Sequence, residues 1–167
     1  MIFVTVGAQM AFDRLVRTVD EWAATRGRKD VFAQIGPTEW RPRHIEWVAF
    51  LPPEDFRKRV ADATMVVAHA GMGSIITALE LGKPILVMPR RGHLQETRND
   101  HQVATAERFM AQGRIRVAFD EAELVMQLDR LEELAQGRRD ILSATASPEL
   151  VQALRRFLEE TAPVPSN

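Results

Sequence analysis

One stretch of the chain, residues 65–102, constrains the fold most because it alternates apolar runs with small and polar residues. In order it contains an apolar run (65–68), a small-residue turn (69–74), a helical segment (74–81), a second apolar run (85–88) and a polar loop (89–102). Short apolar runs bounded by glycine and proline are typical of buried strands. The stretch therefore predicts strand, turn, helix, strand and polar loop, an order that suits a site for a phosphorylated ligand.

The turn between the first strand and the helix contains two glycines. Gly71 and Gly73 allow positive φ angles and let the backbone approach a ligand closely. Ser74 is a favourable helix N-cap, and the free backbone N–H groups of residues 72–76 are expected to point outward. A helix N-terminus carries a partial positive charge that favours phosphate. The alternative is an ordinary strand-to-helix turn that needs two glycines, and sequence mechanics alone leave both interpretations open.

Two well-known phosphate-binding motifs do not fit. Gly82 and Lys83 are followed by Pro84, so the GxxxxGK[ST] motif is absent. In the dinucleotide-binding motif, a third small residue follows the first two glycines, but this chain has Ile76 there. A dinucleotide-dependent oxidoreductase is therefore disfavoured.

Composition describes an ordinary globular chain. Its 167 residues suffice for one domain, 46% of them are apolar and 27% charged, and the net charge of −1 gives no reason to expect nucleic acid as a partner. Cysteine is absent, which excludes disulfides and thiolate metal sites. The first residues lack the basic segment of a signal peptide, and no apolar run approaches the ~20 residues of a membrane span. We expect a cytoplasmic protein whose membrane association is peripheral.

Strand and helix patterns alternate along the rest of the chain. Strands are expected at 2–6, 30–35, 45–50, 65–68, 85–88 and 114–119. Helices are expected from residue 12 to Gly27, with Asp20 on the polar face, and at 54–63, 74–81, 101–112 (with Val103, Ala106 and Met110 apolar), 121–134 and 148–161, after a surface connection at 137–147. This order predicts an α/β fold, a single Rossmann-like doubly wound parallel sheet over residues 1–167. Ligands of such sheets bind beyond the carboxyl ends of the strands.

Several segments along the chain together resemble a known family. They are Phe3–Gly7, Gln34–Gly36, His69–Ser74, Gly82–Pro84 and Asn99–Gln102. The set is similar to the C-terminal, donor-binding domain of the MurG-like family 28 glycosyltransferases. The similarity covers about residues 1–120 and is greatest to the split form of the family typified by PssE of bacterial exopolysaccharide synthesis.

The resemblance implies half of a two-domain GT-B enzyme. The expected function is the donor-binding, catalytic subunit of an inverting UDP-sugar glycosyltransferase that is inactive without its partner. The resemblance implies a membrane-anchored, PssD-like acceptor-binding chain and a lipid-linked saccharide acceptor. No cofactor or metal is expected, and the catalytic base is expected from the partner. The alternative is a nucleotide-sugar-binding or regulatory module without turnover.

The resemblance also assigns roles to individual residues. The corner of Phe50 and Leu51 would hold uracil. The diphosphate would be surrounded by His69, Gly71, Met72, Gly73 and Ser74, with Gly7 letting the first loop approach it. Asp100, His101 and Gln102 would reach the donor sugar, and His69 and Asp100 are the candidate catalytic residues.

Two assignments stay open. Many family members have a ribose-binding Glu where this chain has Thr77, so Thr77 or Glu80, one helical turn later, would hold the ribose. Arg90 and Arg91 are either a solvated pair or a bidentate site for a phosphate or a donor carboxylate, which would favour UDP-glucuronate. By itself, His69 could cap a backbone carbonyl, and Asp100 could cap a helix.

Overall fold

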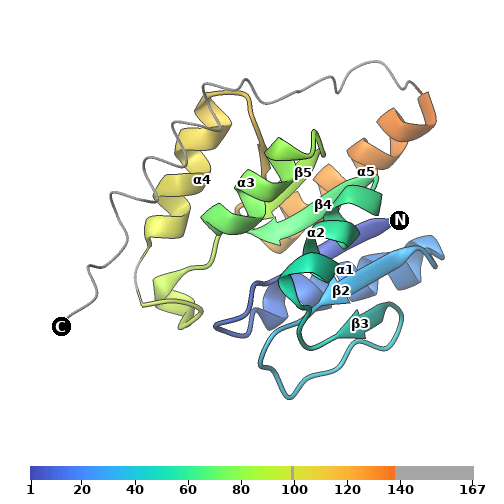
Figure 1. Ribbon diagram of the computed structural model, residues 1–167, viewed down its shortest axis with the longest axis horizontal. Helices are drawn as coiled ribbons and strands as arrows, with labels where there is room; N and C mark the ends of the chain where they lie inside the picture. The colour runs from blue at the N-terminus through green and yellow to red at the C-terminus, as the bar shows by residue number, and fades with distance from the viewer. Residues whose placement is uncertain (99, 138–167) are drawn as a thin grey trace.

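The computed structural model describes residues 1–98 and 100–137, which form a three-layer α/β domain (Figure 1). Its sheet has six parallel strands in the order β3-β2-β1-β4-β5-β6. The strands are β1 (Ile2–Thr5), β2 (Val31–Gln34), β3 (Glu46–Val48), β4 (Met65–His69), β5 (Ile85–Met88) and β6 (Arg116–Val117). The helices are α1 (Asp13–Arg26), α2 (Pro53–Asp62), α3 (Met72–Glu80), α4 (His101–Ala111) and α5 (Glu121–Gly137), with a short 3₁₀ turn η1 at Gly92–Leu94. The predicted Rossmann-like parallel sheet is confirmed.

Both faces of the sheet are buried, which explains why the strands read as continuous apolar runs. Successive residues of each strand point to opposite faces, so Val4 joins one core and Phe3 the other. The first core includes residues of α1 and α5, such as Leu15 and Leu128, both fully buried. The second core includes residues of α2, α3 and α4, such as Ile75. In Figure 1, these three helices accordingly lie on the opposite side of the sheet from α1 and α5.

The centre of the sheet lies between β1 and β4. These strands pair in parallel from Ile2 opposite Met65 to Thr5 opposite Ala68. The strand order reverses here, because the chain extends from β1 through β2 to one edge and from β4 through β5 to the other. At such a switch point the connections that follow the two strands run in opposite directions, which opens a crevice for ligand. Gly7 follows β1 and His69 ends β4, so both residues lie at this crevice.

Several predicted details were wrong. Helix α3 begins at Met72 after Gly71, and Ser74 is buried inside its first turn instead of capping it. The strand predicted at 114–119 pairs only at Arg116–Val117. Met110 of α4 is exposed, and the buried aromatic on that helix is Phe109. The connection predicted at 137–147, apart from Gly137, and the helix predicted at 148–161 lie outside the described residues.

Asp20 is buried, although the helical pattern placed it on the polar face of α1. Only 3% of its surface is exposed. Its carboxylate accepts hydrogen bonds from the backbone N–H groups of Arg43, His44 and Ile45, at 2.8–3.2 Å. A side chain of α1 therefore fixes the irregular connection between β2 and β3, a long-range role that helical periodicity cannot show.

No helix within residues 1–98 and 100–137 has the length and apolar character needed to cross a membrane.

Candidate functional site

A cavity of about 900 Å³ lies at the carboxyl edge of the sheet, beside the β1/β4 switch point. It is lined from the β1–α1 loop, the ends of β2 and β4, the segment leading into α2, the first turns of α3 and the loop between β5 and α4. The predicted site residues that line it are Gly7, Leu51, His69, Gly71, Met72, Gly73, Ser74, Thr77, Arg90, His101 and Gln102. The fold thus brings together residues that are up to 95 positions apart.

The N-terminus of α3 contributes backbone donors to this cavity. The helix begins at Met72, and no side chain caps its first turn. The first N–H groups of a helix lack intrahelical partners. In α3 these belong to Met72, Gly73 and Ser74, all of which line the cavity. The cavity wall therefore combines free N–H groups with the positive end of a helix dipole, which suits an anion.

The His69 imidazole occupies the space that side chains at two glycines would need. A Cβ at Gly7 would lie 2.8 Å from His69 Cε1, and a Cβ at Gly71 only 2.1 Å from His69 Nε2. Gly7 also has a φ of +76°, a conformation that non-glycine residues rarely adopt. These two glycines are required by the packing of the histidine between the β1 and β4 loops.

Gly73 differs from these two glycines. Its φ is not positive, and a Cβ built there meets no atom within 4 Å. A glycine in a helix is less stable than alanine by roughly 0.5–1 kcal/mol. Neither packing nor backbone conformation in the described part of the fold requires a glycine at position 73. A residue without a side chain would be needed there only if a ligand approached the end of the helix.

His69 is held in the neutral form. Burial and the nearby positive charge of Arg90 lower its pKa from 6.5 to about 4, against the opposing effect of the Thr5 backbone carbonyl. Its Nδ1 atom is buried without a well-formed hydrogen bond in the described structure. A neutral imidazole carries one N–H and one acceptor nitrogen, so it can offer a donor to a ligand without carrying charge.

Arg90 does not present its guanidinium to a ligand. Its Nη2 atom donates to the carbonyls of Val6 (2.8 Å) and Met10 (2.7 Å), and its Nη1 atom to those of Ala11 and Glu96 (3.2 Å to the latter). Both hydrogens on each terminal nitrogen are therefore committed. The prediction that Arg90 pairs bidentately with a donor carboxylate or phosphate is wrong for this arrangement, because no parallel pair of N–H groups is left.

Two further predicted site residues lie away from the cavity. The Arg91 guanidinium donates to the Phe119 carbonyl, from Nη2 at 2.8 Å and Nε at 3.3 Å, at the start of the β6–α5 connection. Glu80 forms an ion pair with Arg57 at 3.2 Å. Neither lines the cavity, whereas Thr77 does. Of the two candidates for ribose, only Thr77 is therefore in place, with its hydroxyl donating to the Gly73 carbonyl at 2.8 Å.

Asp100 and Phe50 also lie outside the cavity lining. One carboxylate oxygen of Asp100 accepts the Gly92 N–H at 2.7 Å, so the side chain holds the 3₁₀ turn η1. Phe50 is half exposed, and the neighbouring Leu51 lines the cavity instead, together with Phe56 of α2. Of the two residues of the predicted corner, Leu51 therefore lines the cavity and Phe50 does not.

The charges around the cavity have one sign. The positive charges are those of Arg90 and Arg98, the two histidines His69 and His101 also line the cavity, and no Asp or Glu is among the described residues that do so. Arg90 is 97% buried, since only 3% of its surface is exposed. The sequence assigned no role to Arg98 or to Gln9 of the first loop, which also line the cavity. Their signal was their position in loops that follow strands at the ligand-binding edge.

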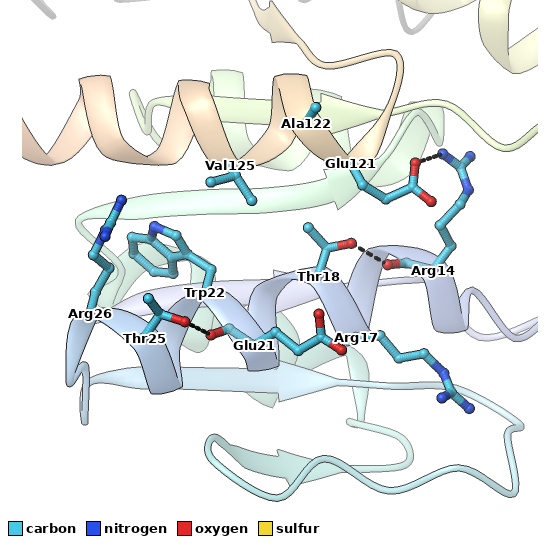
Figure 2. A pocket seen from close by; sticks show the side chains of 10 residues that line it. All are labelled: Arg14, Arg17, Thr18, Glu21, Trp22, Thr25, Arg26, Glu121, Ala122 and Val125. Carbon is cyan, nitrogen blue, oxygen red and sulfur yellow. Dashed lines mark hydrogen bonds and ion pairs between the residues drawn. The ribbon is translucent and has the colours of Figure 1, made fainter.

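A second hollow, of about 760 Å³, lies between α1 and α5 (Figure 2). Two of its charged groups, Arg14 and Glu121, pair with each other at 3.4 Å, as Figure 2 shows, and Arg26 pairs with Asp129 at 2.6 Å. It gathers helix side chains and does not include the loops at the carboxyl edge. Among the described residues, no group of three or more His, Asp or Glu side chains is placed to hold a metal ion.

Sequence comparison gives a match over most of the chain. Residues 1–154 match the glycosyltransferase family 28 C-terminal domain. Two relatives are UDP-N-acetylglucosamine transferase subunits named ALG13. The Mus musculus protein is 27% identical over 123 residues, which are 68% of this chain and 10% of the relative. The Eremothecium gossypii protein is 30% identical over 125 residues, 74% of this chain and 56% of the relative. The match thus spans little more than half of the shorter of these two relatives.

Solved structures share the fold. The solution structure of ALG13 has a TM-score of 0.59 at 19% identity, covering 96% of this chain and 95% of that one. The calicheamicin glycosyltransferase CalG4 has a TM-score of 0.55 at 19% identity, covering 97% of this chain but only 44% of CalG4. This chain therefore corresponds to less than half of CalG4 and to nearly all of the ALG13 structure.

Proposed function

Since the chain belongs to the glycosyltransferase family 28 C-terminal domain, we propose that it is the donor-binding subunit of an inverting UDP-sugar glycosyltransferase. One observation carries the proposal furthest. The cavity at the switch point combines an uncapped helix N-terminus with the positive charges of Arg90 and Arg98 and a bare helix position at Gly73. With no carboxylate among the described lining residues, its charge is complementary to a nucleoside diphosphate.

The diphosphate is assigned to the N-terminus of α3. The free N–H groups of Met72, Gly73 and Ser74 would donate to its oxygens, and the open space at Gly73 would let a phosphate approach the backbone. Departure of UDP leaves negative charge on the diphosphate, which fixed N–H donors stabilise at no reorganisation cost. A neutral His69 would add a donor on the β4 side. In this proposal, no metal is required.

The uracil, the ribose and the sugar of the donor are assigned to the surfaces on either side of the N-terminus of α3. The uracil would lie against Leu51 and Phe56, and the ribose near Thr77. The donor sugar would face His101 and Gln102 at the start of α4. Asp100, bound to the Gly92 N–H, would reach the sugar or act in catalysis only after leaving that contact.

The donor sugar remains to be chosen by experiment. Arg90 and Arg91 donate to backbone carbonyls, so they no longer give a reason to prefer UDP-glucuronate, whose carboxylate they were expected to bind. The relatives are named for UDP-N-acetylglucosamine, which makes this the first donor to test. Arg98 is the remaining arginine of the cavity that could bind a uronic acid.

We further propose that a second chain completes the enzyme. This chain matches 44% of CalG4, so one sheet and its helices are present where that transferase has more than twice the length. A membrane-anchored, PssD-like partner would bring a lipid-linked acceptor and the catalytic base, as in exopolysaccharide synthesis. A nucleotide-sugar-binding module without turnover is the alternative. Transfer to a lipid acceptor, measured with and without the partner, separates the two.

The direct test is calorimetric titration of the chain with UDP, UMP and UDP-N-acetylglucosamine in buffer containing EDTA. We expect UDP to bind more tightly than UMP, because the second phosphate meets the α3 N-terminus. Replacing Gly73→Val should weaken UDP more than UMP. Equal affinity for both nucleotides, or an intact variant that binds UDP as tightly as the unaltered chain, would reject the diphosphate assignment.

A further inference from the structure

We propose that Arg90 is a positioning residue for the donor, acting through the loop between β1 and α1. The inference rests on the proposed function, because it concerns how the donor cavity is held in shape. Its basis is geometric. A buried guanidinium at the end of β5 donates to backbone carbonyls of a loop about 80 positions earlier in the sequence.

The acceptors of Arg90 are concentrated in one short segment. Val6, Met10 and Ala11 span the β1–α1 loop, and each accepts one hydrogen bond from the terminal nitrogens. A planar guanidinium can hold several carbonyls at fixed relative positions because its donors lie in a rigid fork. Arg90 thus determines the curvature of the loop as well as its attachment to the sheet.

The loop has few other anchors. The side chains of Ala8, Gln9 and Met10 are exposed, so they contribute little burial that would hold the loop in place. Within the described part of the chain, the other hydrogen bond to residues 7–11 runs from the Gly7 N–H to Thr5 Oγ1, at 3.2 Å. Loops with few buried contacts occupy the low end of local stability. The order of this loop therefore depends on Arg90.

Arg90 is itself fixed from the opposite wall of the cavity. Its backbone N–H donates to Gln102 Oε1 at 3.2 Å, and its Nη1 donates to the Glu96 carbonyl. The Glu96 carboxylate accepts two hydrogen bonds from Arg14 of α1, from Nε at 2.6 Å and from Nη2 at 2.8 Å. The β5–α4 loop and the β1–α1 loop are thereby joined across the cavity.

This linkage affects two parts of the donor site. Gly7, Ala8 and Gln9 line the cavity from the first loop, and Gln102 lines it from the first turn of α4. Since the His69 imidazole fills the space that a side chain at Gly7 would need, a displaced loop would remove one of the two surfaces that confine the ring. Loss of Arg90 should therefore weaken donor binding without removing any group that touches the donor.

The test uses three variants of the full chain. Arg90→Gln removes the charge and the fork, Arg90→Lys keeps the charge without the fork, and Arg91→Gln is the matched control, one position along with the same change in net charge. Backbone ¹⁵N order parameters of residues 8–11 are measured without ligand, and UDP affinity is measured by calorimetry.

We expect the backbone order parameters of the loop amides to be roughly 0.85 in the unaltered chain, a value typical of rigid backbone. In both Arg90 variants they should fall below about 0.6. UDP affinity should fall about tenfold or more in Arg90→Gln and by a smaller factor in Arg90→Lys, while Arg91→Gln changes neither quantity. Should Arg90→Gln fail to fold, Arg90→Lys alone still decides the outcome.

Weaker UDP binding with unchanged order parameters would overturn the inference, because Arg90 would then act on the ligand directly. A mobile loop with unchanged UDP affinity would overturn it as well. If the unaltered chain binds no UDP, the proposed function fails and the donor role with it. The order parameters then separately show whether Arg90 holds the loop.

Discussion

The imidazole of His69 lies in the space that a side chain at Gly71 would fill, with Nε2 2.1 Å from the position of a Cβ. The two residues are separated by one position, and the Gly71 N–H donates to the His69 carbonyl at 2.8 Å, closing the turn. A histidine in this tight turn folds back over the following backbone, so the glycine is a condition for its placement.

Replacing Gly71→Ala should destabilise the chain by about 1–3 kcal/mol, the usual cost of overpacking. The new Cβ forces the imidazole of His69 out of its site. The double variant with His69→Ala should recover much of this loss, because the clashing ring is gone. Chemical denaturation of the four proteins in this cycle measures the coupling, and additive effects of the two substitutions would contradict the packing account.

At Gly73, stability and binding should change in opposite directions. Gly73→Ala is expected to raise the free energy of unfolding by roughly 0.5–1 kcal/mol, since its position is helical and unobstructed. UDP affinity should fall in the same variant. Gly27→Ala is the contrasting control, because Gly27 has a φ of +65° at the end of α1. It should destabilise the fold and leave UDP binding intact; a Gly73→Ala protein with unchanged UDP binding would count against the proposal.

Stability should depend on pH through His69. Its pKa is about 4 in the folded chain and near 6.5 when unfolded, so between these values the unfolded state binds more protons. The contribution of neutral His69 is complete above about pH 6.5 and is lost as the pH falls toward 4. At 1.36 kcal/mol per unit, the loss is about 3–4 kcal/mol at most. The free energy of unfolding, measured with urea at pH 4.5–7.5, should change less steeply with pH in His69→Gln than in the unaltered chain. His44→Gln, at an exposed histidine, is the control and should keep the original pH dependence.

Asp20→Ala should be more harmful than a substitution on a solvent-facing helix surface. The carboxylate accepts three backbone N–H groups, and its removal leaves partly buried donors without partners. A loss of roughly 1–3 kcal/mol is expected on thermal or chemical unfolding. Glu21→Ala on the neighbouring exposed position is the matched control, and equal effects of the two changes would show that the Asp20 contacts contribute little.

The sequence alone determined the alternation of strands and helices, because apolar periodicity and glycine or proline boundaries are local signals. The start of α4 at His101 agrees with the prediction, α1 ends at Arg26 just before the predicted stop at Gly27, and α2 begins at Pro53, one residue before its predicted start. A parallel sheet then places every strand's following loop at one edge, which is why Gly7, His69, Gly73 and Gln102 could be assigned to one site before the structure was known.

Tertiary structure alone decided which polar side chains serve the fold. Asp20 was predicted on the polar face of its helix and Arg90 as a solvated or ligand-binding residue, yet both are buried because their partners are backbone groups from distant loops. Backbone acceptors and donors leave no residue-type signature, so no pattern in the chain indicates such contacts. The different roles of the two glycines also became visible only in the tertiary structure. Gly71 must lack a side chain because the His69 imidazole fills that space, whereas nothing in the described fold requires a glycine at position 73.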